Sequence, residues 1–175
     1  MKTAEERQLG RAKNAALAYL ERKLSIPKIY INAIWDGHDV DVLAIDRDGV
    51  GDVHVVLLFA INVSSDTAAL FKDLTQAIEP LMDRFSIIPA QYKYIAAVNT
   101  NPNGLIALFG LPHPIAEKSF APDGIGRIGF LTIDEAPDGE LHAKIVFKPE
   151  RFRAKIAKLA DEYVEQHTAD WEMRA

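Results

Sequence analysis

Two aspartates separated by one residue are the side chains with the clearest chemical potential in this sequence. Asp39 and Asp41 begin the stretch Asp-Val-Asp-Val-Leu-Ala-Ile45, which is otherwise apolar. Aspartate is depleted inside strands, so Asp41 needs an explanation there. One explanation is a divalent metal, because carboxylate oxygens are the ligands that Mg²⁺ prefers. The other is structural: Asp39 ends a hairpin, and Asp41 pairs with a nearby lysine, arginine or backbone amide.

A second chemical candidate is a run of basic side chains late in the chain. Its members are Lys148, Arg151, Arg153, Lys155 and Lys158. Phe152 and Ile156 would lie on the other side of a helix, so the charges would face solvent. Such a face could bind nucleic-acid phosphates, or it could be an ordinary solvated helix face. The formal net charge of −5 argues mildly against non-specific nucleic-acid binding.

Hydrophobic periodicity and turn residues predict the elements that must position these groups. Thr3 and Glu6 fit a capping box at the start of a helix that Pro27 would stop. The predicted order is helix 3–23, strands 29–35, 39–46 and 53–63, helix 66–86, strand 92–99, hairpin 127–134 and 140–147, and a helix starting at Pro149 and running to about 166. Pro80 should kink or split the second helix. The prolines in 105–124 allow only short helical pieces there.

Strand alternation predicts which residues share a face of the sheet. In the first strand, Ile29, Ile31, Ala33 and Trp35 should lie on one face. In the second strand, Asp39, Asp41, Leu43 and Ile45 should do the same. The strand between Tyr92 and Asn99 should run parallel to the one before it, because a helix connects the two.

This element order resembles the αβββαβ core of the PD-(D/E)XK, or restriction-endonuclease-like, superfamily over roughly residues 3–99. The resemblance implies an α+β domain with a mixed sheet and a three-layer α/β/α tendency, followed by a hairpin and a C-terminal helix over about 125–166. It also implies an aspartate on the second strand, for which Asp41 is the preferred counterpart and Asp39 the alternative. The family holds Mg²⁺ between that aspartate and an acidic-x-Lys motif on the third strand, and the ion activates a water.

The third strand departs from the family's pattern, because Val55–Val63 offers no acid followed two residues later by lysine. Lys72 and Glu79 on the following helix are the candidates for a catalytic lysine and acid that have migrated there. The favoured function is a catalytically degenerate nuclease-fold module that binds nucleic acid or protein, in DNA processing or defence. The alternatives are an active Mg²⁺-dependent endonuclease and an interaction protein with no nucleic-acid role.

Composition sets the remaining expectations. A chain of 175 residues that is 49% hydrophobic suits a single domain over 1–175. The absence of cysteine excludes disulfides and thiolate metal sites. No apolar run is long enough for a membrane span, and the first helix does not resemble a signal peptide. We therefore expect a cytoplasmic protein with DNA or a protein as partner, and a homodimer is left open.

Overall fold

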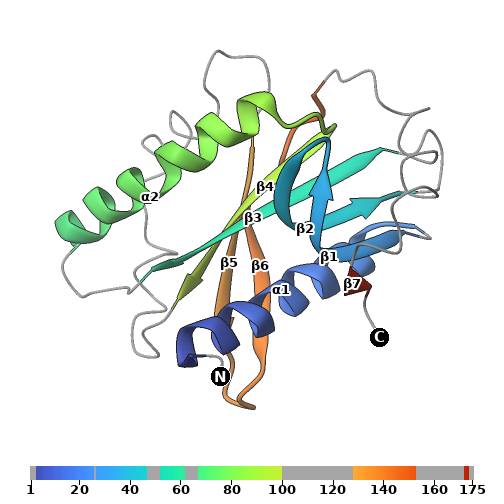
Figure 1. Ribbon diagram of the computed structural model, residues 1–175. Coiled ribbons are helices and arrows are strands. Elements are labelled where there is room, and N and C mark those ends of the chain that lie inside the picture. Colours follow the sequence, from blue (N-terminus) through green and yellow to red (C-terminus); the bar gives the residue numbers. More distant parts are fainter. Residues whose placement is uncertain are drawn as a thin grey trace.

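In a computed structural model, the chain is described at residues 3–25, 27–46, 52–61, 67–99, 128–152 and 172–173. The elements in these ranges are α1 (Ala4–Lys23), β1 (Lys28–Trp35), β2 (His38–Ile45), β3 (Val53–Ile61), α2 (Thr67–Ile87), β4 (Tyr92–Asn99), β5 (Gly129–Glu135), β6 (Leu141–Phe147) and β7 (Glu172–Met173) (Figure 1). Neither of these two helices combines the length and apolar character that crossing a membrane requires. The segment 105–124 lies outside the described residues.

The strands form one mixed sheet in the order β6-β5-β4-β3-β2-β1-β7. The first three strands are an antiparallel meander, and α2 then carries the chain to β4, which is parallel to β3. The predicted parallel crossover is therefore confirmed. β5 is parallel to β4 and forms an antiparallel hairpin with β6, while β7 pairs with the outer edge of β1.

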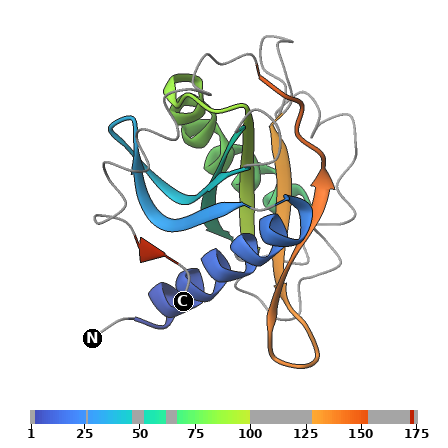
Figure 2. The same cartoon turned by 90° about the vertical axis from the view of Figure 1, so that its right-hand side faces the viewer.

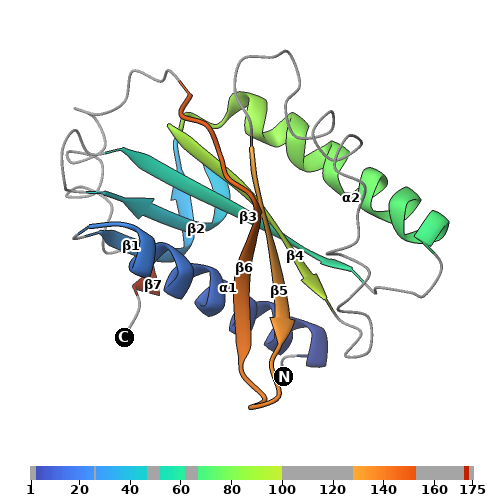
Figure 3. The same cartoon turned by 180° about the vertical axis from the view of Figure 1, so that it is seen from behind.

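One helix covers each face of the sheet, as Figures 2 and 3 show from two further directions. On one face, Ala12, Ala16 and Leu20 of α1 pack into a buried cluster with residues of β2 to β6. On the other face, α2 packs its apolar stripe into a second buried cluster that reaches from β1 to β6. The expected α+β class and the layering of helix, sheet and helix are confirmed.

α1 begins as its local sequence predicts, and α2 runs through Pro80 without a break. The capping box of α1 is present: the Thr3 hydroxyl accepts from the Glu6 amide, and the Glu6 carboxylate accepts from the Thr3 amide. Pro80, in contrast, does not split α2, which is continuous from Thr67 to Ile87. Pro80 and Gln76 are both exposed, so the carbonyl that loses its helical partner can be hydrated.

The expected alternation of faces is wrong in the middle of the β1–β2 hairpin. Asn32 has φ of +53°, in the left-handed region, and stands opposite Asp41 where the ladder is interrupted. After Asn32 the faces exchange, so that Ala33 joins Tyr30 on the α2 side while Ile31 packs on the α1 side. β2 switches in the same way, with Val40 and Leu43 both on the α2 side. A break of this kind re-aims the side chains at its position.

The β1–β2 turn falls at Asp36-Gly37, a dipeptide that favours two-residue hairpin turns. Asp36 and Gly37 have φ of +49° and +77°, as a two-residue type I′ turn requires, and Trp35 pairs directly with His38. The indole N–H of Trp35 donates to the Pro89 carbonyl at 2.7 Å, which ties this turn to the segment that follows α2.

The expected helix does not begin at Pro149. Residues 148–152 are not helical, and the Phe152 amide donates instead to the Gln91 carbonyl at 2.7 Å. Pro149 packs over Gly129, where a Cβ would lie only 2.9 Å from the proline Cδ. Lys93, which is buried, donates to the Phe85 carbonyl, and its ammonium lies 4.7 Å from the centre of the Phe152 ring. These tertiary contacts hold the segment in an extended form. The rest of the predicted helix, to about 166, lies outside the described residues.

His54 is a buried histidine on the α1 side of β3. Its ring stacks on Tyr92, with ring centres 4.6 Å apart, and its Nδ1 has no hydrogen-bond partner among the residues that the structure describes. Burial lowers the pKa of His54 from 6.5 to about 4, although nearby Asp52 opposes the shift. The unfolded chain therefore takes up a proton at a higher pH than the folded chain does.

This difference predicts an acid-dependent loss of stability. The contribution of neutral His54 is complete above pH 6.5 and is lost as the pH falls toward 4, by up to about 3 kcal/mol. Urea unfolding of the wild type between pH 7 and 4 measures the slope. His54→Phe keeps a stacked ring without a titrating group and should flatten that slope. His142→Gln, a change at an exposed histidine, should not. Equal slopes for wild type and His54→Phe would contradict the assignment.

Candidate functional site

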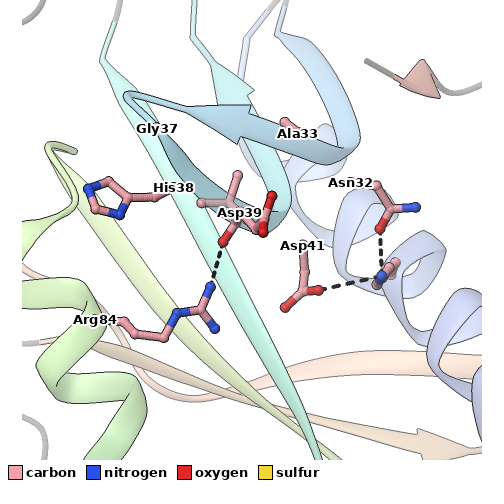
Figure 4. Close-up of a pocket in the computed structure, with 9 residues that line it drawn as sticks. Asn32, Ala33, Gly37, His38, Asp39, Asp41 and Arg84 are labelled. Atoms are coloured by element: carbon pink, nitrogen blue, oxygen red, sulfur yellow. Dashed lines mark hydrogen bonds and ion pairs between the residues drawn. The ribbon is translucent and has the colours of Figure 1, made fainter. Parts of the chain in front are cut away.

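The break in the β1–β2 hairpin opens a pocket between the two helices. β2 pairs with β3 only from Val42 to Ile45, so the hairpin tip separates from β3 beyond that point. A polar pocket of about 670 Å³ lies there (Figure 4). Its lining residues are Lys13, Asn32, Ala33, Gly37, His38, Asp39, Val40, Asp41 and Arg84. The two aspartates picked out from the sequence therefore share one pocket.

Asp41 is held by two contacts that occupy both of its carboxylate oxygens. Oδ2 accepts a hydrogen bond from the Leu58 amide at 2.7 Å, and Oδ1 lies 3.5 Å from the Lys13 ammonium. Lys13 also donates to the Asn32 Oδ1 at 2.5 Å. The Leu58 amide lies beyond the end of the β2–β3 ladder, and the Asp41 carboxylate replaces the strand carbonyl that would otherwise accept its hydrogen bond. Lys13 balances the negative charge of that carboxylate. These contacts match the structural explanation of Asp41, a lysine and a backbone amide together.

Asp39 lies nearer the other wall of the pocket. Arg84, from the last turn of α2, donates to the Asp39 backbone carbonyl at 2.5 Å. The Asp39 side chain is exposed, and His38 beside it is half-buried. In Figure 4, Arg84 points toward Asp39, and Asp41 points toward the side of the pocket where Asn32 lies. The pocket thus has one cation from each helix, Arg84 and Lys13, with the two aspartates between them.

The remaining catalytic candidates do not join this pocket. Lys72 and Glu79 are exposed on α2, and neither lines the cavity. The register of β2 and β3, continued by one residue, places Asp41 beside Leu57, which is fully buried. Across the ranges that the structure covers, no group of three or more histidine, aspartate or glutamate side chains is arranged to hold a metal ion.

The predicted nucleic-acid residues are only partly within the described chain. Lys148 and Arg151 are exposed. Arg151 forms a two-point ion pair with Asp52, with Nη2 and Nε at 2.9 and 3.2 Å from the carboxylate oxygens. Arg153, Lys155 and Lys158 lie outside the described residues.

Sequence reasoning missed three members of the pocket. Lys13 and Arg84 are single charges on the polar sides of two amphipathic helices, a pattern that carries no functional signal by itself. Asn32 gives a weak signal in the sequence, because it is a polar residue that tolerates the left-handed region and it interrupts an apolar strand. Only the fold brings these residues to the two aspartates.

Comparisons with known proteins support the fold alone. Neither a family model nor a curated protein matches this chain. A solved structure, the SPO1766 protein of unknown function from Silicibacter pomeroyi, is similar with a TM-score of 0.51 and 17% sequence identity. The similarity covers 97% of this chain and 90% of that protein.

The contacts of Asp41 predict a structural effect of its removal. Asp41→Ala leaves the half-buried Leu58 amide without an acceptor and should lower the free energy of unfolding by about 1–3 kcal/mol. Asp41→Asn keeps an acceptor oxygen and should cost less. Lys13→Met removes a partly exposed ion pair and should cost no more than about 1 kcal/mol.

Chemical denaturation of the three variants provides the measurement. Asp39→Ala, at an exposed side chain in the same pocket, is the matched control and should stay within about 0.5 kcal/mol of wild type. The assignment is wrong if Asp41→Ala proves as stable as Asp39→Ala.

Proposed function

We propose that this protein is a nuclease-fold domain that has lost cleavage and acts by binding nucleic acid, in a cytoplasmic setting. The order α1-β1-β2-β3-α2-β4 is that of the restriction-endonuclease-like core. The antiparallel meander and the parallel β3–β4 pair are in keeping with it. The same proposal assigns the domain a role in DNA processing or defence.

The contacts made by both carboxylate oxygens of Asp41 are the observation that supports the proposed loss of cleavage. In a Mg²⁺ nuclease this carboxylate would share the ion with a second acid on the neighbouring strand. Here Lys13 supplies the positive charge at 3.5 Å, and the Leu58 amide takes the other oxygen. A lysine ammonium in that position repels a divalent cation and makes one unnecessary for charge balance.

The residues present do not fit a catalytic Mg²⁺. Hard divalent ions take six or more oxygen ligands, usually with at least one or two carboxylates free to bind. Asp39 and Asp41 are the only acids that line the described pocket, and Leu57 occupies the position where the next strand would add an acid. We therefore infer that the described pocket does not hold a catalytic metal ion.

Binding in place of cleavage predicts a specific pattern in a nuclease assay. Supercoiled plasmid, single-stranded DNA and RNA should remain intact with wild-type protein in Mg²⁺ or Mn²⁺. Fluorescence anisotropy should detect binding to at least one of these nucleic acids, and that binding should weaken as salt rises, because it depends on phosphate contacts.

Two variants make the assay decisive. Metal-dependent cleavage that disappears in Asp41→Asn and persists in Asp83→Asn, a change at an exposed acid of α2, would establish an active nuclease and overturn the proposal. Intact substrates together with no binding at 50 mM salt would favour the remaining alternative, an interaction protein with no nucleic-acid role.

A further inference from the structure

A basic and aromatic surface lies at the opposite end of α1 from its capping box. We define it by Lys23, Tyr92, Lys148 and Arg151, which come from the end of α1, the start of β4 and the segment after β6. None of these residues lines the pocket that contains Asp41. Lys148 and Arg151 belong to the basic run in the sequence, whereas Lys23 gives no local signal that would place it near them.

Lys23 is the member with the most unusual surroundings. Its ammonium lies 5.8 Å from the centre of the Tyr19 ring and 5.9 Å from that of Tyr94, so two aromatic rings face one charge. Within the part of the chain that the structure describes, Lys23 has no ion-pair partner. Burial and the nearby charge of Lys148 both lower its pKa. Tyr94 and Pro149 both pack against Gly129, so Lys23 above the Tyr94 ring lies near the segment that carries Lys148 and Arg151.

Arg151 is fixed in place and still able to donate. Its ion pair with Asp52 uses one N–H from Nε and one from Nη2, and the guanidinium has five. Its side chain remains 46% exposed, so the Nη1 group has hydrogens for a further acceptor. Asp52 therefore orients the guanidinium without consuming it.

The aromatic side chains of this surface are packed against one another and against His54. Tyr92 is half-buried and stacks on buried His54 at an interplanar angle of 10°, and Tyr19 meets Tyr94 edge to face. Tyr92 also lies close enough to Arg151 to raise the pKa of the guanidinium, after the larger effect of Asp52. Two contacts hold the segment that carries Lys148 and Arg151. Pro149 packs on Gly129, and the Phe152 amide donates to the Gln91 carbonyl.

We propose that this surface binds the phosphodiester backbone of nucleic acid, with Lys23 and Lys148 as direct phosphate contacts and Arg151 as a third donor. The inference rests on the proposed function, because it names the surface through which the domain would bind. An extended polyanion suits it better than a single phosphate ion. The three cations come from two segments, the end of α1 and the stretch after β6, and all three are exposed.

The test compares charge removal at this surface with charge removal elsewhere on the same helix. A fluorescent 20-nucleotide single strand, the corresponding duplex and poly-L-glutamate are the probes, measured by anisotropy over a salt series. Lys23→Gln/Lys148→Gln should weaken single-strand binding on the order of 10- to 100-fold at 50 mM salt. It should also reduce the log–log salt slope by about 1.4, the effect of two phosphate contacts.

Two controls separate the effect of surface charge on binding from any effect of the substitutions on folding. Arg7→Gln removes an exposed charge sixteen positions earlier in α1, roughly 24 Å away, and should leave affinity and slope unchanged. Lys23→Arg/Lys148→Arg keeps both charges and should retain most of the affinity. Equal thermal midpoints for all variants would show that binding changes do not come from unfolding.

Each remaining outcome counts against the surface in a distinct way. Salt-sensitive nucleic-acid binding that the double glutamine variant leaves intact would overturn this surface and leave the proposed function standing. Binding of poly-L-glutamate as tightly as the oligonucleotides would assign the surface to acidic protein partners. No binding of any nucleic acid at 50 mM salt would remove both proposals together.

Discussion

The hydrogen bond from the Leu58 amide to Asp41 is the contact on which the shape of this molecule depends. The β2–β3 ladder stops at Val42, and a strand that leaves its neighbour normally exposes backbone groups that need partners. The carboxylate satisfies one of them at 2.7 Å and permits the hairpin tip to turn away from the sheet. Without that separation there would be no pocket between the tip and the two helices.

The same region shows how a strand break and a helix are fitted to each other. Asn32 adopts a left-handed conformation opposite Asp41, and both faces exchange there. Lys13 of α1 contacts both side chains, so one helix residue joins the two strands at the point where their regular pairing fails. A polar cluster of this type specifies one arrangement of an otherwise apolar interface, because any other arrangement would leave its charges unpaired.

Much of the fold can be predicted from the sequence, and the parts that cannot share a physical cause. The capping box of α1, the Asp36-Gly37 turn and β4 depend on local signals, and each appears where those signals place it. Alternation in β1 fails at Asn32, because periodicity assumes an unbroken ladder. The helix expected from Pro149 fails because Phe152 finds a backbone partner at Gln91, far away in the sequence. Proline allows a helix to start but does not require one.

The candidate site also has a part that the sequence predicts and a part that it does not. Asp39 and Asp41 attract attention by residue type, and they do lie in one pocket. Lys13 and Arg84 give no local signal, yet Lys13 balances the charge of the Asp41 carboxylate and Arg84 binds the Asp39 backbone carbonyl. A carboxylate beside an ammonium and a carboxylate beside another acid look alike in sequence, and only the packing of α1 distinguishes them.

The pairing of β7 with β1 has a consequence for how the chain is made. Tyr30 and Ile31 find their outer partners in Glu172 and Met173, roughly 140 residues later. At synthesis rates of about 5–20 residues per second, the edge of β1 lacks that partner for roughly 7–30 seconds. An open strand edge is a template for pairing with another chain. During that interval this edge is the place where two nascent copies could join, and β7 is the segment that later closes it.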